Sequence, residues 1–361
     1  MKILLVTNHV AGNDGWSRYA MNLRDALVAR GHTVIVETPP KPLTFLTRPW
    51  RSYFLSRKLK RIMRDAACDV LHIAVEPYAL AVFFLPKAIV EKTILTVHGN
   101  YGIRPFRLRM TRWIMQRVFS RIPRFITVSI YTKKAVIKEL QRLGKTTLAQ
   151  RFDSHATVIH NGIPLPLRER RTLEPHTKKH ILHVGGVKPA KGVGEAIEAC
   201  ALYKKTYGTP FHLTIIGAFW RDHYVQGLEL LIHEKNLKDC VSFRGQISDA
   251  ELVEEYRKAD LLLVPSVTVD TTFEGFGLVY LEANAFGIPA IGPHISGAAE
   301  AIKDGVSGYQ IDVFRPEMIA MRLHWILDEG KIKAEDCRKW AEEHSMKNVA
   351  EEVERLYSAS C

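Results

Sequence analysis

Cysteine is scarce in this chain, and its few cysteines form no pattern. The 361 residues include five cysteines, with no CxxC pair and no Cys/His cluster. This spacing indicates neither a disulfide framework nor a zinc site, and it favours a reducing compartment. The cysteines are Cys68, Cys200, Cys240, Cys337 and Cys361.

Long apolar runs are also missing. The first residues, Met1–Val6, are too short a run for a signal peptide and predict a first strand. The apolar run Ala79–Leu85 ends at Pro86 and is too short to span a bilayer. The length allows two domains, and the hydrophobic share of 47% is ordinary for a globular protein. We therefore expect a cytoplasmic protein, and the basic segments described below predict that it is peripheral at the inner face of the membrane.

Acidic residues are scarce in the first half of the chain. Residues 1–165 hold 27 lysines and arginines against 9 acidic residues, a net charge of +18. Residues 166–361 hold 24 against 29, a net charge of −5. This imbalance indicates that the first half faces an anionic partner.

Short apolar runs alternate with helical stretches in both halves, the βαβ pattern of a parallel, doubly wound α/β sheet. The pattern pauses at Pro164–Pro166 and at the polar run Arg168–Lys179, where we expect an interdomain linker. Neither half has a GxGxxG motif after its first strand, which argues against a dinucleotide dehydrogenase. The predicted strands are Ile3–Thr7, Thr33–Glu37, Val70–Ile73, Thr93–Val97, Phe125–Val128, Ile181–Val184, Leu213–Ile216, Val241–Phe243, Leu261–Val264 and Pro289–Ile291.

The most informative stretch runs from Glu274 to Glu282. A buried strand precedes it, a Gly-Phe-Gly turn opens it, and a helix follows from Leu278. The free N–H groups of residues 276–278 at such a helix start predict an anion site. Because carboxylates accept hydrogen bonds from hydroxyl groups and repel phosphate, the two glutamates indicate a ligand that carries both groups. A nucleotide sugar fits this description.

This stretch resembles the signature of the family 4 glycosyltransferases, and further motifs hold the family's order from about residue 1 to residue 312. The resemblance implies the GT-B fold, with two doubly wound Rossmann-like domains facing a central cleft. It implies an acceptor-binding domain over residues 1–165 and a nucleotide-sugar-binding domain over 166–342. Residues 343–361 would pack back on the first domain as a helix. The further motifs are Arg30–His32, Thr127–Ser129, Val158–Ile163, Val184–Val187, Lys191–Val193, Ser296–Glu300 and Asp304–Gly308.

The resemblance also assigns roles to single residues. Lys191 would bind the donor diphosphate, Glu274 the transferred sugar, Glu282 the ribose, and His98 a sugar hydroxyl. The chain departs from the family at Gly186, where the family has an arginine, and Lys188 is the nearest substitute in the sequence. The predicted catalytic residues are Glu274, His98 and Lys191. The predicted donor-binding residues are Gly15, Gly186, Lys188, Lys191, Arg244, Gly245, Gln246, Ile247, Glu274, Gly275, Phe276, Gly277, Leu278 and Glu282.

By the same resemblance, the reaction is the retaining transfer of a hexose to a glycan or lipid-linked acceptor, in cell-surface polysaccharide or glycolipid synthesis. It needs no metal and no cofactor beyond the nucleotide-diphosphate sugar. A GT-B enzyme of another reaction type, such as an epimerase, is an alternative that the spacing of the two glutamates disfavours. A nucleic-acid-binding protein would explain the basic half, but the chain lacks the aromatic platforms and groove-reading motifs of such proteins.

Two acid-free basic segments lie in the first half. Residues 48–64 hold seven basic residues, and residues 104–124 hold seven arginines. Residues 48–64 predict an amphipathic helix, with an apolar face opposite a basic face that includes Arg57, Lys58, Arg61 and Arg64. The basic face predicts docking to an anionic membrane or to an acidic acceptor. A simpler reading stays open, in which the apolar face covers the protein's own sheet and the basic face is only solvated.

Overall fold

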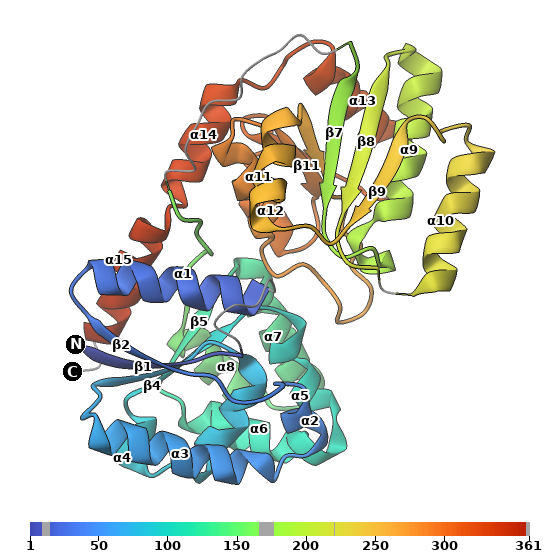
Figure 1. The fold of residues 1–361 in the computed structure, drawn as a ribbon. Helices are drawn as coiled ribbons and strands as arrows, with labels where there is room; N and C mark the ends of the chain where they lie inside the picture. Colours follow the sequence, from blue (N-terminus) through green and yellow to red (C-terminus); the bar gives the residue numbers. More distant parts are fainter. Residues whose placement is uncertain (9–14, 166–176, 220, 359–361) are drawn as a thin grey trace. The chain divides into compact units, whose positions relative to one another are not determined.

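The computed structural model describes residues 1–8, 15–165, 177–219 and 221–358. The chain divides into two compact units, one of Met1–Pro164 with Ser345–Cys361 and one of Leu165–His344. Within the described residues, each unit contains a parallel six-stranded sheet with helices packed on it (Figure 1).

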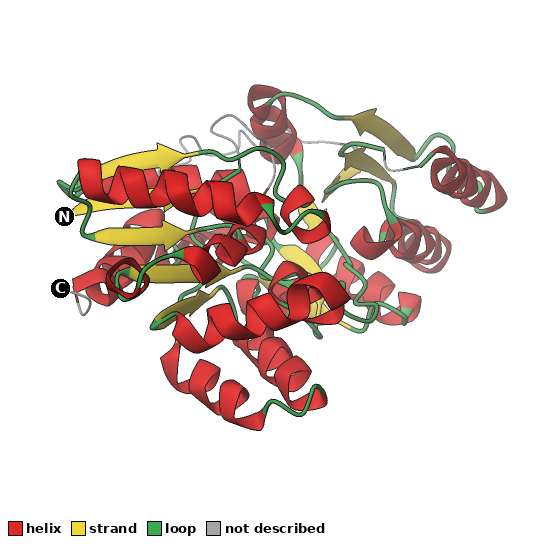
Figure 2. Ribbon diagram, turned by 90° about the horizontal axis from the view of Figure 1, so that it is seen from below, coloured by secondary structure: helices red, strands yellow, loops and turns green. Residues whose placement is uncertain are grey.

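The strand order of the first sheet is β2-β1-β3-β4-β5-β6. Its inner strands β3 and β4 are buried over their whole length, as expected for a sheet that helices cover on both faces. Figure 2 shows strands of this sheet side by side. The strands are β1 (Lys2–Val6), β2 (Thr33–Glu37), β3 (Val70–Ile73), β4 (Thr93–Val97), β5 (Arg124–Thr127) and β6 (Ala156–Val158).

One face of the first sheet carries the helix α1 (Gly15–Ala29) and the C-terminal helix α15 (Met346–Ser358) (Figure 1). Met346, Val349 and Val353 of α15 share a core with side chains of β1 and α1. The remaining elements of the unit are α2 (Thr44–Thr47), α3 (Arg51–Asp65), η1 (Glu76–Phe84, a 3-10 helix), α4 (Lys87–Val90), η2 (Asn100–Gly102), α5 (Arg104–Arg107), α6 (Arg109–Arg121), α7 (Ile130–Arg142) and α8 (Thr146–His155).

The second sheet has the order β12-β11-β10-β7-β8-β9. Its core combines the apolar side chains of these strands with those of α9 and α13. The strands are β7 (Lys179–Val184), β8 (Phe211–Ile216), β9 (Val241–Gly245), β10 (Leu261–Leu263), β11 (Ala290–Pro293) and β12 (Gly308–Ile311). The helices are η3 (Pro189–Lys191), α9 (Val193–Tyr207), α10 (Asp222–Glu234), α11 (Asp249–Lys258), α12 (Leu278–Ala285), η4 (Gly297–Ala301), α13 (Pro316–Leu327) and α14 (Ala334–Glu343).

The ten predicted strands are all present, with ends within about two residues of the prediction. The sequence pattern missed β6 and β12, each at one edge of its sheet. The strand β6 has only three residues, and β12 begins at a glycine. The apolar run Ala79–Leu85 lies mostly in the 3-10 helix η1, where residues 79–82 are buried in the first unit. Across the described parts of the chain, no helix is both long enough and apolar enough to cross a membrane.

Candidate functional site

The loop after β7 holds Lys191 in a fixed place. Lys191 ends η3, and Gly192 follows in the left-handed region with a φ of +68°. A Cβ atom at Gly192 would lie 1.9 Å from the carbonyl oxygen of Pro265, so only glycine permits this approach. His183 of β7 donates from Nε2 to the carbonyl oxygen of Lys191 at 2.9 Å. Burial lowers the pKa of His183 to about 4, so this ring is neutral at pH 7.

Lys191 and Glu274 form an ion pair. The two side chains keep 22% and 21% of their surface exposed, so a ligand can reach them. Burial by itself would raise the pKa of Glu274, but the charges of Lys191 and Lys188 hold it below its ordinary value. Burial, followed by the charge of Lys191, lowers the pKa of Lys188, and Glu274 opposes that shift. The structure therefore brings two cations and one carboxylate together.

The helix α12 begins beside this group. Gly277 precedes it with a φ of +87°, and a Cβ atom there would lie 2.5 Å from the Tyr280 ring and 3.4 Å from Cγ of Glu274. Phe276 is buried, and the backbone N–H of Gly297 donates to the carbonyl oxygen of Glu274 at 2.9 Å. The glycine turn thus places Glu274 against the first turn of α12, where backbone N–H groups have no partner within the helix.

Glu282 lies farther along α12, half-buried, and has a partner that the sequence did not reveal. The hydroxyl of Tyr256, a buried residue of α11, donates to Oε2 of Glu282 at 2.9 Å. This bond fixes the orientation of the Glu282 carboxylate, whose two oxygens can each accept more than one hydrogen bond. Residues 256 and 282 belong to different helices, so helical periodicity gave no signal for their pairing.

Three glycines meet at the carboxyl ends of β7, β8 and β9. A Cβ atom at Gly217 would lie 2.0 Å from the carbonyl oxygen of Gly185, and the N–H of Gly217 donates to the carbonyl oxygen of Gly245 at 2.9 Å. Gly217 was not among the predicted site residues, although a glycine directly after a strand is a usable signal.

The predicted loop after β9 is mostly exposed: Arg244 and Gln246 are exposed, and Ile247 is half-buried. Arg244 also pairs with Glu255 at 3.3 Å.

Gly186 differs from its neighbours. Its φ lies outside the left-handed region, and a Cβ atom there would meet only the carbonyl oxygen of Ala218, at 3.7 Å. That distance is an ordinary van der Waals contact. The backbone at this position therefore leaves room for the Cβ atom of a larger residue, such as the arginine that the family carries.

The first unit holds His98 and Gly15. His98 follows β4, and its Nε2 donates to the carbonyl oxygen of Ala74 at 2.9 Å, so binding a sugar through Nε2 would require breaking this bond. Its backbone N–H donates at 2.8 Å to Glu76, a fully buried carboxylate that the sequence pattern did not reveal. Burial raises the pKa of Glu76 to about 7. Gly15 opens α1 with open space at its Cβ position, while Gly12 of the same loop lies outside the described residues.

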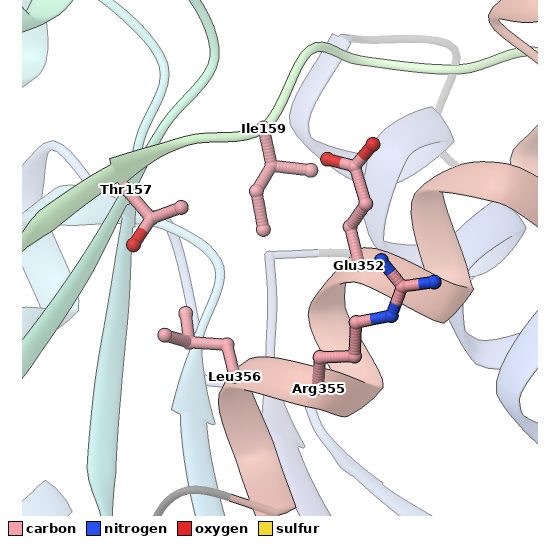
Figure 3. A pocket seen from close by; sticks show the side chains of 5 residues that line it. All are labelled: Thr157, Ile159, Glu352, Arg355 and Leu356. Carbon is pink, nitrogen blue, oxygen red and sulfur yellow. The ribbon is translucent and has the colours of Figure 1, made fainter.

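A hollow in the first unit lies between β6 and α15 (Figure 3). Thr157 and Ile159 line it on one side, and Glu352, Arg355 and Leu356 of α15 line the other. None of the predicted site residues contributes to it. The hollow therefore adds nothing to the group around Glu274.

Two family models together match most of the chain. The model for Glycosyltransferase Family 4 matches residues 13–166, and the model for Glycosyl transferases group 1 matches residues 167–344. This chain is a member of glycosyltransferase family 4. The resemblance predicted from the sequence motifs is thereby confirmed, and both the Lys191 loop and the Glu274 turn lie within the second match.

Curated relatives match this family 4 chain over part of their length. A D-inositol 3-phosphate glycosyltransferase of Acidothermus cellulolyticus is 33% identical over 163 residues, which are 44% of this chain and 35% of the relative. The amylovoran biosynthesis glycosyltransferase AmsK of Erwinia amylovora is 37% identical over 135 residues, 37% of this chain and 32% of the relative. The matches thus span about a third of the length of these relatives.

Solved structures resemble the family 4 chain over nearly its whole length. The sucrose-phosphate synthase of Thermosynechococcus elongatus has a TM-score of 0.77 at 19% identity, over 99% of this chain and 98% of that one. Anabaena HepE in complex with UDP-glucose has a TM-score of 0.71 at 18% identity, over 99% and 100%. These likenesses confirm the GT-B fold class, with two Rossmann-like domains.

Proposed function

We propose that this chain is a retaining glycosyltransferase that uses a nucleotide-diphosphate sugar. It would transfer a hexose to a glycan or lipid-linked acceptor in the synthesis of a polysaccharide or glycolipid. The observation that carries the proposal is the Lys191–Glu274 ion pair at the start of α12. A cation for a diphosphate and a carboxylate for sugar hydroxyls stand there in direct contact.

The ion pair explains how one site binds both halves of the donor. An incoming diphosphate would compete with Glu274 for Lys191, assisted by Lys188 and by the positive end of the α12 dipole. Glu274, once released, would accept hydrogen bonds from hydroxyls of the transferred sugar. Glu282, oriented by Tyr256, would bind the ribose hydroxyls. The donor therefore replaces the Lys191–Glu274 ion pair with one contact to each partner, diphosphate to Lys191 and hydroxyl to Glu274.

The same groups suit transfer with retention. The acceptor would attack on the face from which the diphosphate leaves, and a departing phosphate oxygen would take its proton. The protein then has to stabilise the negative charge that grows on the diphosphate, which Lys191, Lys188 and the α12 amides supply without a metal. A sugar-binding role for His98 stays a prediction, since its Nε2 already bonds to Ala74.

Relatives support the choice of substrates. HepE was solved with UDP and with UDP-glucose, and AmsK is named for amylovoran biosynthesis. WcaL of Escherichia coli, 32% identical over 150 residues, is described as a putative glycosyltransferase of colanic acid biosynthesis. These descriptions support a nucleotide-sugar donor and a role in polysaccharide synthesis.

A thermal-shift panel tests the donor assignment. Nucleoside diphosphates and their sugar esters should raise the melting temperature, because a ligand that binds only the folded state stabilises it. The matching nucleosides, which lack the diphosphate, should have little effect. Stabilisation by oligonucleotides alone would contradict the proposal, and turnover of the nucleotide sugar without an acceptor would favour an epimerase-like enzyme.

Gly186→Arg should tighten binding of the diphosphate by roughly tenfold or more, since a charge-assisted hydrogen bond is worth about 1.5–3 kcal/mol. The φ of Gly186 lies outside the left-handed region and its Cβ position is unobstructed, so the backbone does not oppose the substitution. Isothermal calorimetry with nucleoside diphosphates measures the change. Gly186→Ala is the control for the added Cβ. If the arginine weakens binding while alanine does not, Lys188 already occupies the space that the family's guanidinium fills.

A further inference from the structure

Large apolar side chains are exposed together on one side of the first unit. Trp50 and Phe54 keep 57% and 65% of their surface exposed, and Trp113 keeps 56%. Single exposed apolar residues are normal, but a contiguous group of this kind marks an interaction surface. The group also includes Tyr53, Phe84 and Met110.

Ring contacts join these residues into one ridge across three elements. Tyr53 of α3 contacts Phe84 of η1 with ring centroids 5.6 Å apart. Phe84 contacts Phe83 at 5.0 Å, and Phe83 contacts Trp113 of α6 at 5.2 Å. Both α3 and α6 pack against η1, and this packing places the rings of the three elements next to one another. We call this group of Tyr53, Phe54, Phe83, Phe84 and Trp113 the aromatic ridge.

Arginines border the aromatic ridge on both helices. On α6, Arg109 and Arg117 are exposed and lie one helical turn to either side of Trp113, with the Arg117 guanidinium 5.6 Å from the Trp113 ring. On α3, Arg57 and Arg61 are exposed on the turns that follow Phe54. The segments 48–64 and 104–124 contain no acidic residue to neutralise them. Lys58, which was predicted to belong to this surface, pairs with Glu37 at 2.7 Å and keeps 49% of its side chain exposed.

We propose that the aromatic ridge inserts into the interface of an anionic membrane while the bordering arginines bind lipid headgroups. Aromatic rings favour the boundary between headgroups and acyl chains, and cations beside them favour negatively charged lipid. The inward side of α3 is already used, since Leu55, Leu59 and Met63 are buried in the unit. The exposed aromatics therefore belong to a second, outward surface.

A lipid surface fits this side of the unit better than a protein partner. The charge has one sign over the segments 48–64 and 104–124, and cations of one sign beside exposed aromatic rings suit a negatively charged lipid surface. The step from docking to a lipid-linked acceptor rests on the proposed function. Docking itself does not depend on it.

Vesicle sedimentation at several salt concentrations tests the proposal. Vesicles of phosphatidylcholine with roughly a third phosphatidylglycerol should bind the protein at low salt and lose it as salt screens the charges. Phe54→Ala with Trp113→Ala should weaken binding at least tenfold at low salt, where the wild-type protein binds. Arg57→Gln with Arg61→Gln and Arg117→Gln should remove the preference for the anionic lipid.

Matched variants on the second unit are the controls. Phe314→Ala with Leu230→Ala removes exposed apolar residues, and Lys235→Gln with Lys238→Gln removes exposed cations. Both should bind vesicles like the wild-type protein. The proposal is overturned if anionic vesicles do not bind at low salt, or if the ridge variant binds like its control. It is also overturned if Trp113→Ala abolishes a dimer instead.

Binding is measured without nucleotide, so the result is independent of the transferase reaction. A variant that loses vesicle binding should keep its nucleotide affinity. If the wild-type protein binds vesicles but transfers no sugar, that result contradicts only the proposed function.

Discussion

Glu274→Gln is expected to lower the rate of sugar transfer by about two to three orders of magnitude, with the fold unchanged. Glutamine has nearly the shape of glutamate, so the turn before α12 and the bond from Gly297 to the carbonyl oxygen of Glu274 should remain. The lost charge matters because Glu274 is held ionised beside Lys191. The amide would bind sugar hydroxyls more weakly and would no longer balance the two lysines.

Steady-state kinetics and the melting temperature should be measured together on this variant. Glu229→Gln on α10 is the matched control, because Glu229 is an exposed glutamate of the same unit. We expect the control to turn over like the wild-type protein. Near-normal turnover by a well-folded Glu274→Gln variant would rule out a role for Glu274 at the transferred sugar.

Lys191→Ala is expected to weaken binding of both the nucleoside diphosphate and the sugar donor. A charge-assisted hydrogen bond contributes about 1.5–3 kcal/mol, which corresponds to a loss of roughly 10- to 150-fold in affinity. His183 bonds to the carbonyl oxygen of Lys191, so the loop itself should keep its conformation. Calorimetry with the diphosphate gives the affinity directly.

Lys205→Ala, at an exposed position of α9, is the control for removing a lysine from the second unit. A double-mutant cycle with Glu274→Gln separates the ion pair from the ligand contacts. We expect the two substitutions to be non-additive for diphosphate affinity, since the residues are in direct contact. Unchanged diphosphate affinity in Lys191→Ala would show that another group binds the phosphates.

The strand pattern was readable from the sequence because it is local. A buried parallel strand is an apolar run of four to six residues, and Thr93–Val97 has that form without reference to the rest of the chain. The Gly-Phe-Gly turn before α12 was readable for the same reason. Gly277 has a left-handed φ that glycine adopts readily, and the helix follows at the next residue.

The partners of the site residues were not readable, because each pair is distant in the sequence. Lys191 and Glu274 are 83 positions apart, and they meet because β7 and β10, the strands that precede them, are neighbours in the sheet. Tyr256 reaches Glu282 between two helices, and Gly217 meets Gly185 across two strand ends. Periodicity within one element contains no information on such pairs.

By itself, then, the sequence determined the elements, the family and the residues with suitable chemistry, since these follow from local pattern and motif spacing. The tertiary structure decided which of those residues lie together. It paired Lys191 with Glu274, attached Lys58 to Glu37, and gathered Tyr53, Phe84 and Trp113 into one exposed ridge. The physical reason is that strand order and helix packing set distances between residues far apart in the chain, and these distances decide which charges neutralise each other and which rings touch.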